Sequence, residues 1–289
     1  MKTRIISALV GTVLLIGILF CPYEWVFVGA MAALAAIATW ELLHNTGIMK
    51  NLAVCIVSML FSALAVLGVG AAESVVAMAR PYYPLPADAL VPLIVGLLAA
   101  YIVFMLIAWL VCRKVLSLVT FSKALLLTAD ATLGFAALAC LRLSPSVFGL
   151  PFVMLPLVIA WMSDTGAYFV GTFLGKHKMA PVISPKKSWE GFFGGWLISI
   201  GLTAVFGVIC NVFIGGTSSL HIKVGLITVF AALLAPLSVL GDLFASLIKR
   251  RCGIKDYGNI MPGHGGVMDR FDSVIFIAPL LWLLLELFH

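Results

Sequence analysis

Long uninterrupted runs of apolar residues recur along the chain, and they constrain its fold more than any other feature. Nine such runs, most of them close to the length of a membrane-spanning helix, are separated by short polar segments. About 20 apolar residues are needed for an α-helix to cross the hydrocarbon core of a bilayer. Strands of a membrane barrel would instead alternate in hydrophobicity over about 10 residues, a pattern that the sequence lacks. The runs predict an all-α, polytopic membrane protein with about nine transmembrane helices.

The composition excludes the other broad classes of protein. Of the 289 residues, 63% are hydrophobic and 10% are charged, whereas a soluble domain is about 45–50% apolar and about 25% charged. A soluble globular, disordered or fibrous protein is therefore excluded. The six cysteines show no Cys-x-x-Cys spacing and lie mostly within apolar runs, which favours packing roles over a disulfide framework or a zinc site.

The predicted spans can be bounded to within about 2–4 residues. They are Ile5–Phe20, Trp25–Leu43, Leu52–Ala71, Leu90–Val111, Leu125–Leu141, Val147–Leu174, Trp189–Ile214, Val224–Ile248 and Phe271–Phe288. The first lacks a small-residue cleavage site, so we interpret it as a retained helix and not as a signal peptide. We expect the Pro- and Tyr-containing segment Ala72–Ala89 to be an external loop.

Basic residues are strongly biased to one side of this predicted topology. With nine spans, the side of the N-terminus holds all of the 18 Lys and Arg residues except Arg80, Arg142 and Lys223. Because basic loops stay in the cytoplasm, we predict a cytoplasmic N-terminus and an external C-terminus. Topology then accounts for the net charge of +6, and we expect no nucleic-acid partner.

The two halves of the chain differ in their polar residues. Glu41, Asp130 and Glu286 lie singly within apolar runs. Half of the 12 acids lie near the predicted cytoplasmic ends of the last four spans: Asp164, Glu190, Asp242, Asp256, Asp269 and Asp272. Charged residues inside a membrane are costly and mark functional sites. We therefore predict a scaffold region over 1–145, with lipid or dimer contacts, and a catalytic region over 146–289.

Asp242, Ser246 and Lys249 are spaced to lie on one face of a helix. They would bring an anion, a hydroxyl and a cation into a membrane-embedded cavity. A substrate site and a simple buried ion pair both fit this pattern.

A glycine-rich loop follows, with His264 among Gly263, Gly265 and Gly266. Glycines let backbone N–H groups approach phosphate oxygens, and a helix N-terminus attracts anions. Asp269 and Asp272 share the first turn of the next helix, although a cap needs only one acid. Carboxylates beside phosphate-binding lysines would repel phosphates unless a divalent cation bridged them. We therefore predict that Asp242 and Asp269 ligate Mg²⁺ on a nucleoside triphosphate.

Two further polar stretches interrupt apolar sequence. In Ser184–Gly191, Pro185 ends any preceding helix and Ser188 is placed to cap the next one. The paired Lys186 and Lys187 indicate either a positively charged flank or a site for a substrate phosphate. Ser163–Tyr168 predicts a helix face that lines a cavity and does not contact lipid.

These stretches together resemble the phosphatidate cytidylyltransferase (CDP-diacylglycerol synthase) family. The family signature is similar to Ser246-x2-Lys249-Arg250-x4-Lys255-Asp256-x-Gly258-x3-Pro262-x-His264-Gly265-Gly266-x2-Asp269-Arg270-x-Asp272. The stretches from Ser163 to Tyr168 and from Ser184 to Gly191 also resemble the family, in the same order. Met261 stands where Leu, Ile or Phe is usual and Ser188 where Thr is common. The resemblance runs from about residue 160 to the C-terminus, and the earlier part matches only as apolar helices.

The resemblance implies a nucleotidyltransferase of phospholipid synthesis that converts CTP and phosphatidate into CDP-diacylglycerol and pyrophosphate. It also implies Mg²⁺ dependence, a homodimer, and a site in the cytoplasmic (inner) membrane that faces the cytoplasm, among membrane lipids. We expect Asp242 and Asp269 to hold Mg²⁺, with Asp164 or Asp272 in a second shell or on a second cation. The residues expected to act in catalysis or to bind substrate are Lys249, Arg250, Lys186, Lys187, Ser246, Lys255, His264, Gly265, Gly266 and Arg270.

Two other classes of function fit part of the pattern. Intramembrane acids and a glycine-broken segment also occur in transporters, but the chain has no internal repeat and its charge lies on one predicted side. Another lipid-phosphate enzyme is the second alternative, either a CTP-dependent polyprenol kinase or a CDP-alcohol phosphotransferase. The Asp-Gly-x2-Ala-Arg element of the phosphotransferases is absent from the sequence.

Overall fold

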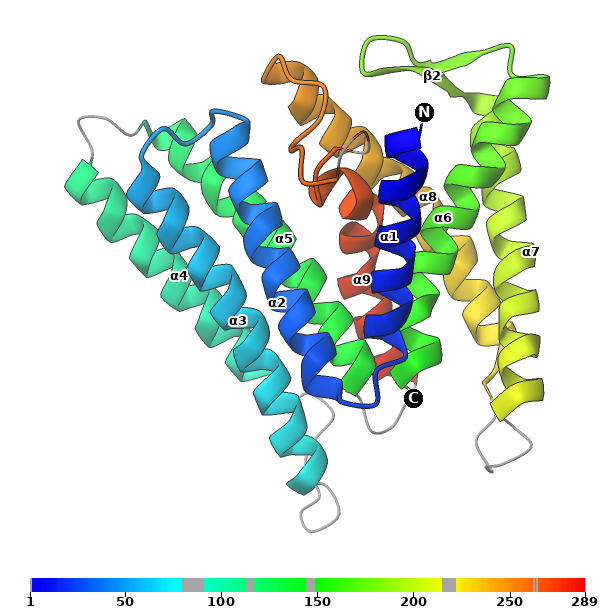
Figure 1. The fold of residues 1–289 in the computed structure, drawn as a ribbon, viewed down its shortest axis with the longest axis horizontal. Coiled ribbons are helices and arrows are strands. Elements are labelled where there is room, and N and C mark those ends of the chain that lie inside the picture. The colour runs from blue at the N-terminus through cyan, green and yellow to red at the C-terminus, as the bar shows by residue number, and fades with distance from the viewer. Residues whose placement is uncertain are drawn as a thin grey trace. The chain divides into compact units, whose positions relative to one another are not determined.

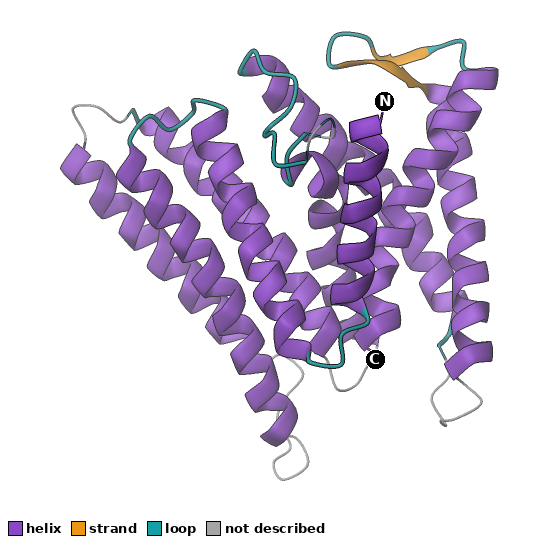
Figure 2. Ribbon diagram, in the orientation of Figure 1, coloured by secondary structure: helices purple, strands orange, loops and turns teal. Residues whose placement is uncertain are grey.

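The computed structural model describes residues 2–79, 91–112, 117–143, 149–214, 222–261, 263 and 265–288. This part of the chain is helical apart from its loops and one small hairpin (Figures 1 and 2). Its α-helices are α1 (Lys2–Leu19), α2 (Glu24–Trp40), α3 (Leu52–Ala79), α4 (Val91–Cys112), α5 (Leu118–Leu143), α6 (Gly149–Leu174), α7 (Trp189–Ile214), α8 (Val224–Arg251) and α9 (Met268–Phe288). A π-helical turn, η1 (Glu41–Asn45), extends α2, and β1 (Lys178–Ala180) pairs with β2 (Ser184–Ser188).

Each predicted span coincides with one of these helices. Within the described residues, seven helices are long and apolar enough to cross a membrane, namely α2 with η1, α3, α5, α6, α7, α8 and α9. The shorter apolar stretches Leu9–Leu19 and Val95–Leu110 lie in α1 and α4. The prediction of an all-α, polytopic membrane protein is confirmed. Nine as the number of spans, and the orientation of the two termini, stay predictions.

Two helices extend further than their hydropathy indicates. Helix α5 begins at Leu118 and not at Leu125, because the Ser117 hydroxyl accepts the Thr120 backbone N–H at 3.1 Å and caps the helix. Helix α3 continues to Ala79, so the first residues of the predicted loop Ala72–Ala89 are helical. The rest of that predicted loop, 80–89, lies outside the described residues. Polar residues lower the mean hydropathy at both helix ends without breaking the helix.

The described chain divides into two compact units, and the first comprises residues 1–150 and 251–271. In this unit α2, α3 and α5 pack side by side (Figure 1). A Cβ atom on Gly70 of α3 would lie 2.6 Å from Val28 of α2, so the absent side chain permits close approach. Thr132 of α5 donates to Ser62 of α3 at 2.8 Å. Small residues and interhelical hydroxyl bonds are typical of packing in a membrane.

The second unit comprises residues 151–250 and 272–289. Glycines again mark its tightest contacts, because a Cβ on Gly195 of α7 would stand 2.8 Å from the backbone nitrogen of Ala167 in α6. In α8, a Cβ on Gly241 would stand 2.8 Å from the Cβ of Phe276 in α9. Gly241 directly precedes Asp242, so the close α8–α9 contact lies beside the acid that the sequence analysis singled out.

A two-stranded antiparallel hairpin connects α6 to α7 and is the one β-sheet among the second unit's described residues. Its register pairs Lys178 with Ser188 and Ala180 with Ser184. The sequence predicts a helix stop at Pro185 but no strand. The division into a scaffold over 1–145 and a catalytic region over 146–289 concerns roles and stays a prediction.

Candidate active site

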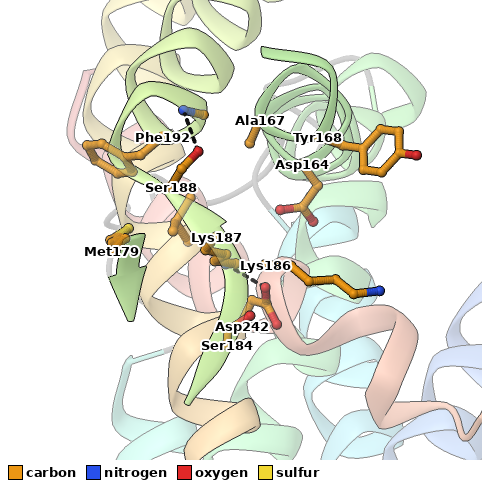
Figure 3. A pocket seen from close by; sticks show the side chains of 12 residues that line it. Asp164, Ala167, Tyr168, Met179, Ser184, Lys186, Lys187, Ser188, Phe192 and Asp242 are labelled. Atoms are coloured by element: carbon orange, nitrogen blue, oxygen red, sulfur yellow. Dashed lines mark hydrogen bonds and ion pairs between the residues drawn. The ribbon is translucent and has the colours of Figure 1, made fainter. Parts of the chain in front are cut away.

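A pocket of about 270 Å³ lies in the second unit, where the hairpin meets three helices. Helix α6 contributes an acid and an aromatic ring, the hairpin contributes two lysines, and α8 contributes a second acid (Figure 3). The lining residues are Asp164, Ala167, Tyr168, Met179, Ser184, Lys186, Lys187, Ser188, Gly191, Phe192, Val239 and Asp242. The pocket thus unites the three sequence stretches that contain Ser163–Tyr168, Ser184–Gly191 and Asp242.

Lys187 and Asp242 form an ion pair inside this pocket. The Lys187 ammonium lies 2.5 Å from Oδ2 of Asp242, and the two side chains are 21% and 26% exposed. The Ser246 hydroxyl donates to Oδ1 of Asp242 at 3.3 Å. Each carboxylate oxygen of Asp242 therefore has one partner: the Lys187 ammonium at Oδ2 and the Ser246 hydroxyl at Oδ1. Lys186 also lines the pocket, but its ammonium points away from this pair (Figure 3).

Asp242, Ser246 and Lys249 all lie in α8, as predicted. Acids of two other helices interact with the charged members of this set. The Asp164 carboxylate interacts electrostatically with Asp242 and Lys187. Asp272, in α9, interacts electrostatically with Asp242, Lys249 and Asp164. Three carboxylates from α6, α8 and α9 therefore lie in one region with two lysines. The lysines can attract an anionic ligand, and the carboxylates can attract a cation bound with it.

The oxygen donors of this region fit Mg²⁺. The described residues contain no group of three or more His, Cys, Asp or Glu side chains arranged to hold a metal by themselves. Mg²⁺ requires less than that, since it binds through one or two carboxylates while substrate phosphates and water complete its coordination. Asp164, Asp242 and Asp272 supply hard carboxylate oxygens of the required kind. No thiolate or imidazole lines the pocket formed by the described residues.

Local hydrogen bonds fix the position of the two lysines. The Ser188 hydroxyl accepts the Gly191 N–H at 3.2 Å, so Ser188 caps α7 as the sequence predicted. Glu190, in the first turn of α7, accepts the backbone N–H groups of Lys176 at 3.1 Å and His177 at 3.2 Å. Its carboxylate also lies 2.5 Å from Nδ1 of His177. The hairpin that carries the lysines is thereby tied to the helix that follows it.

Arg250 joins the hairpin to α8. Its Nε atom donates to the backbone carbonyl of Ile183 at 3.4 Å, across the turn of the hairpin. The family resemblance places Arg250 among the residues expected to act in catalysis or to bind substrate. The contact indicates an additional structural task for the same side chain, because it connects the hairpin to the helix of Asp242.

The loop between α8 and α9 (252–267), together with the first turn of α9, belongs to the first unit. One oxygen of Asp269 accepts the backbone N–H groups of Tyr257 at 2.7 Å and Gly266 at 3.0 Å. Gly265 has a φ of +86°, which other residues rarely adopt, and its carbonyl accepts the Met261 N–H at 3.0 Å. Asp269 therefore organises its own loop.

Several predicted site residues are not among those that line the pocket. Asp242 and Asp269 belong to different units, so their shared Mg²⁺ site stays a prediction. Lys255 and Arg270 are exposed residues of the first unit, and their contacts with substrate stay predictions as well. His264 lies outside the described residues.

Glu41 is one of three acids within apolar runs, with Asp130 and Glu286, for which the sequence alone predicts no role. It is completely buried, and its two carboxylate oxygens accept the backbone N–H groups of Val267 at 3.1 Å and Met268 at 2.9 Å. Asn45 donates to the Tyr257 carbonyl at 2.8 Å. An acid within the apolar run Trp25–Leu43 was the available signal. Its partners lie more than 200 residues away, so local sequence did not reveal them.

Comparison with known proteins agrees with the family resemblance found in the sequence. A sequence model of the family described as "Cytidylyltransferase family" matches residues 2–288. A phosphatidate cytidylyltransferase of Staphylococcus epidermidis is 45% identical over 137 residues, which cover 47% of this chain and 50% of that protein. The phosphatidate cytidylyltransferase of Bacillus subtilis is 45% identical over 141 residues, which cover 49% of each chain. The chain thus spans about half the length of the curated relatives it matches.

Proposed function

The chain belongs to the cytidylyltransferase family, and on that premise we propose that it transfers a cytidylyl group from CTP to phosphatidate. The products are CDP-diacylglycerol and pyrophosphate, and the reaction serves phospholipid synthesis. The relatives that share 45% identity with part of this chain are named phosphatidate cytidylyltransferases. The observation that carries the proposal is the pocket in which Lys187 pairs with Asp242 beside Asp164 and Lys186.

The transfer exchanges one phosphoanhydride bond for another. An oxygen of the phosphatidate phosphate attacks the α-phosphorus of CTP, and the bond from that phosphorus to the β-phosphate bridging oxygen breaks. Because the lipid phosphate is already ionised at neutral pH, the enzyme needs no strong general base. It must instead align two anions and stabilise the charge that develops during transfer.

The lysines are suited to the lipid phosphate. Lys186 and Lys187 follow Pro185 in β2, and Ser188 and Glu190 fix the start of the next helix behind them. Lys187 would exchange part of its contact with Asp242 for a phosphate oxygen of phosphatidate. Lys249 and Arg250, at the end of α8, would bind the triphosphate from the other side of Asp242.

The carboxylates are suited to Mg²⁺. Asp242 and Asp272 would hold the ion, with Asp164 beside them, while Asp269 stays the further ligand predicted from sequence. When bound, the ion screens the phosphate charges and supports an in-line displacement. Asp164 also interacts electrostatically with Lys187, and Asp272 with Lys249.

The membrane provides the second substrate and the setting. We place the protein in the cytoplasmic membrane of a bacterium, with the pocket open to the cytoplasm, because the charge bias of the sequence favours that orientation. Phosphatidate would reach the pocket from the bilayer and CTP from the cytoplasm. We also propose a homodimer, which the family resemblance implies.

The direct test uses the purified protein in detergent micelles with phosphatidate, radiolabelled CTP and Mg²⁺. We expect a cytidine-containing product that partitions into chloroform, with release of one pyrophosphate per product molecule. Chelation of divalent cations with EDTA should abolish product formation, and added Mg²⁺ should restore it.

Two results would contradict this function. Full activity in excess EDTA would exclude the divalent cation, and the absence of a lipid-soluble cytidine product would exclude the transfer. Ion-driven uptake by reconstituted vesicles without consumption of CTP would instead support the transporter alternative, which the intramembrane acids alone would allow.

A further inference from the structure

A buried carboxylate in the first half of the chain holds the N-terminus of the last helix. Glu41 lies in the π-helical turn η1 and is 0% exposed. Each of its two oxygens accepts one backbone N–H, from Val267 and from Met268, the first residue of α9. These N–H groups belong to the helix terminus and have no partner within the helix. The negative charge also lies at the positive end of the helix dipole.

The loop closes around this carboxylate so tightly that side chains are excluded. A Cβ atom on Gly258 would stand 2.8 Å from Cδ of Glu41 and closer still to its Oε1. A Cβ atom on Gly266 would stand 2.5 Å from the same Cδ atom. Asn45, one π-helical turn from Glu41, donates to the carbonyl of Tyr257, which is itself fully buried. Turns of π-helix are rare and occur frequently at functional sites.

The same loop carries residues that the proposed function uses. Asp269 accepts N–H groups from Tyr257 and Gly266, which directly neighbour the Glu41 contacts. Glu41 and Asp269 therefore both accept backbone hydrogen bonds from the same segment. Their two carboxylates also interact electrostatically. A shift at Glu41 would be passed to Gly265, Gly266 and Asp269, which are predicted to bind nucleotide phosphates and Mg²⁺.

We propose that Glu41 is a positioning residue for nucleotide binding, acting through its hydrogen bonds to the loop between α8 and α9. It rests on the proposed function, because the loop is taken as part of the CTP site. It assigns the first half of the chain a role in catalysis beyond that of a scaffold. Glu41 itself is buried under the loop and would not contact substrate.

The main test replaces Glu41 with Gln, which keeps the size of the side chain but removes its charge. The amide can accept one N–H and turns a donor toward the other, so one of the two bonds is lost. Hydrogen–deuterium exchange of the detergent-solubilised protein should show amides 257–268 exchanging about tenfold faster, with α7 and α8 unchanged. Glu24→Gln is the matched control, because Glu24 lies on the same helix and pairs only with Arg142, at 3.4 Å, in the described residues.

Kinetics separate positioning from a general loss of folded protein. In Glu41→Gln and Glu41→Asp, the KM for CTP should rise about tenfold while the KM for phosphatidate stays within about twofold. A purely structural defect lowers the active fraction and therefore changes kcat with both KM values intact. Equal KM values for CTP in Glu41→Gln and Glu24→Gln, together with unchanged exchange of the loop, would overturn the proposal.

The same contact can be tested from the side of the loop. Gly258→Ala should raise loop exchange and the KM for CTP, since its methyl group displaces the loop from Glu41. In a Glu41→Ala background that methyl group has room, so the second substitution should add no further loss. Additive losses would contradict the proposed contact. If Glu41→Gln fails to fold, Gly258→Ala alone decides the question, because it keeps the Glu41 carboxylate: unchanged loop exchange and an unchanged KM for CTP would overturn the proposal.

The outcomes distinguish the inference from the function on which it rests. A wild-type protein without CTP-dependent activity would refute the proposed function, while the exchange experiment would still decide whether Glu41 holds the loop. An active wild-type protein whose loop is indifferent to Glu41 would refute the positioning role and leave the function intact.

Discussion

At the scale of single residues, several charged side chains of the described residues have close polar partners. Lys187 lies against Asp242, His177 against Glu190, and the buried Glu41 against two backbone N–H groups. A charge in a low-dielectric setting is costly unless such partners compensate it. The Lys187–Asp242 pair differs from the others because it lines the pocket, where we propose that a substrate phosphate replaces part of the contact.

Asp242→Asn tests the pocket at this scale. The substitution keeps the shape of the side chain and the hydrogen bond from Ser246, but it removes the charge that faces Lys187. We expect kcat to fall by at least about a hundredfold, because the change removes a proposed metal ligand and its effect should reach the upper end of the range for metal-site residues. The measurement is the radiolabelled transfer assay with protein of confirmed monodispersity.

Asp130→Asn is the matched control for that substitution. Asp130 is also an acid within a helix of the membrane region, but it lies in α5 and does not line the pocket. Its activity should stay within about threefold of wild type, on the scale of surface substitutions away from special features. If both variants lose activity equally, the loss reflects the membrane charge in general and not the pocket.

At the scale of elements, glycine decides where helices meet. Gly195 of α7 faces the backbone of α6, where a Cβ would lie 2.8 Å from the Ala167 nitrogen. Gly201 lies farther along the same helix with no atom within 4 Å of its Cβ position. The first of these contacts adjoins the pocket, because Ala167, which the Gly195 Cβ position approaches, also lines it.

Gly195→Ala and Gly201→Ala form a matched pair. The first should destabilise the protein by about 1–3 kcal/mol, because the methyl group meets backbone that cannot rotate away. The second should be neutral or slightly stabilising, since alanine favours the helix and nothing obstructs it. Thermal unfolding in detergent, followed by fluorescence, compares the two midpoints. A similar midpoint for both variants would show that the α6–α7 contact tolerates a side chain.

At the scale of the whole molecule, charge and hydropathy determine orientation. Basic residues concentrate in alternate connections, including the hairpin and the loop after α8. The charge pattern predicts that both connections lie in the cytoplasm. A soluble nucleotide could then reach the residues that the sequence analysis assigned to it, while the lipid substrate stays in the bilayer.

Cysteine labelling tests this orientation. Val182, in the turn of the hairpin, is 88% exposed, and Lys223, before α8, is exposed as well. A membrane-impermeant maleimide should label Val182→Cys in inside-out vesicles and Lys223→Cys in right-side-out vesicles, above the background of the native cysteines. The opposite pattern would reverse the orientation, and labelling of both positions from one side would exclude an odd number of crossings between them.

The sequence alone determined the membrane class, the approximate helices and the residue types of the site. Hydropathy is a sum over neighbouring residues, and helix caps such as Ser188 act within one turn, so both can be recognised locally. The ends of α3 and α5 were misjudged because polar residues at a helix terminus lower the hydropathy without ending the helix. The hairpin was missed because its strands, of three and five residues, carry little periodic signal.

Tertiary structure alone decided which charges meet. The spacing of Asp242, Ser246 and Lys249 predicts one helix face, and the family resemblance adds Asp164 or Asp272, but neither predicts that Lys187 lies against Asp242. The metal-ligand role of Asp269 stays a prediction, and the structure adds that its carboxylate accepts two backbone N–H groups of its own loop. Glu41 appeared as an isolated acid, and it holds a helix that begins 227 residues later. Such pairings depend on how helices pack, which is a property of contacts between distant segments and is not encoded in the periodicity of any one of them.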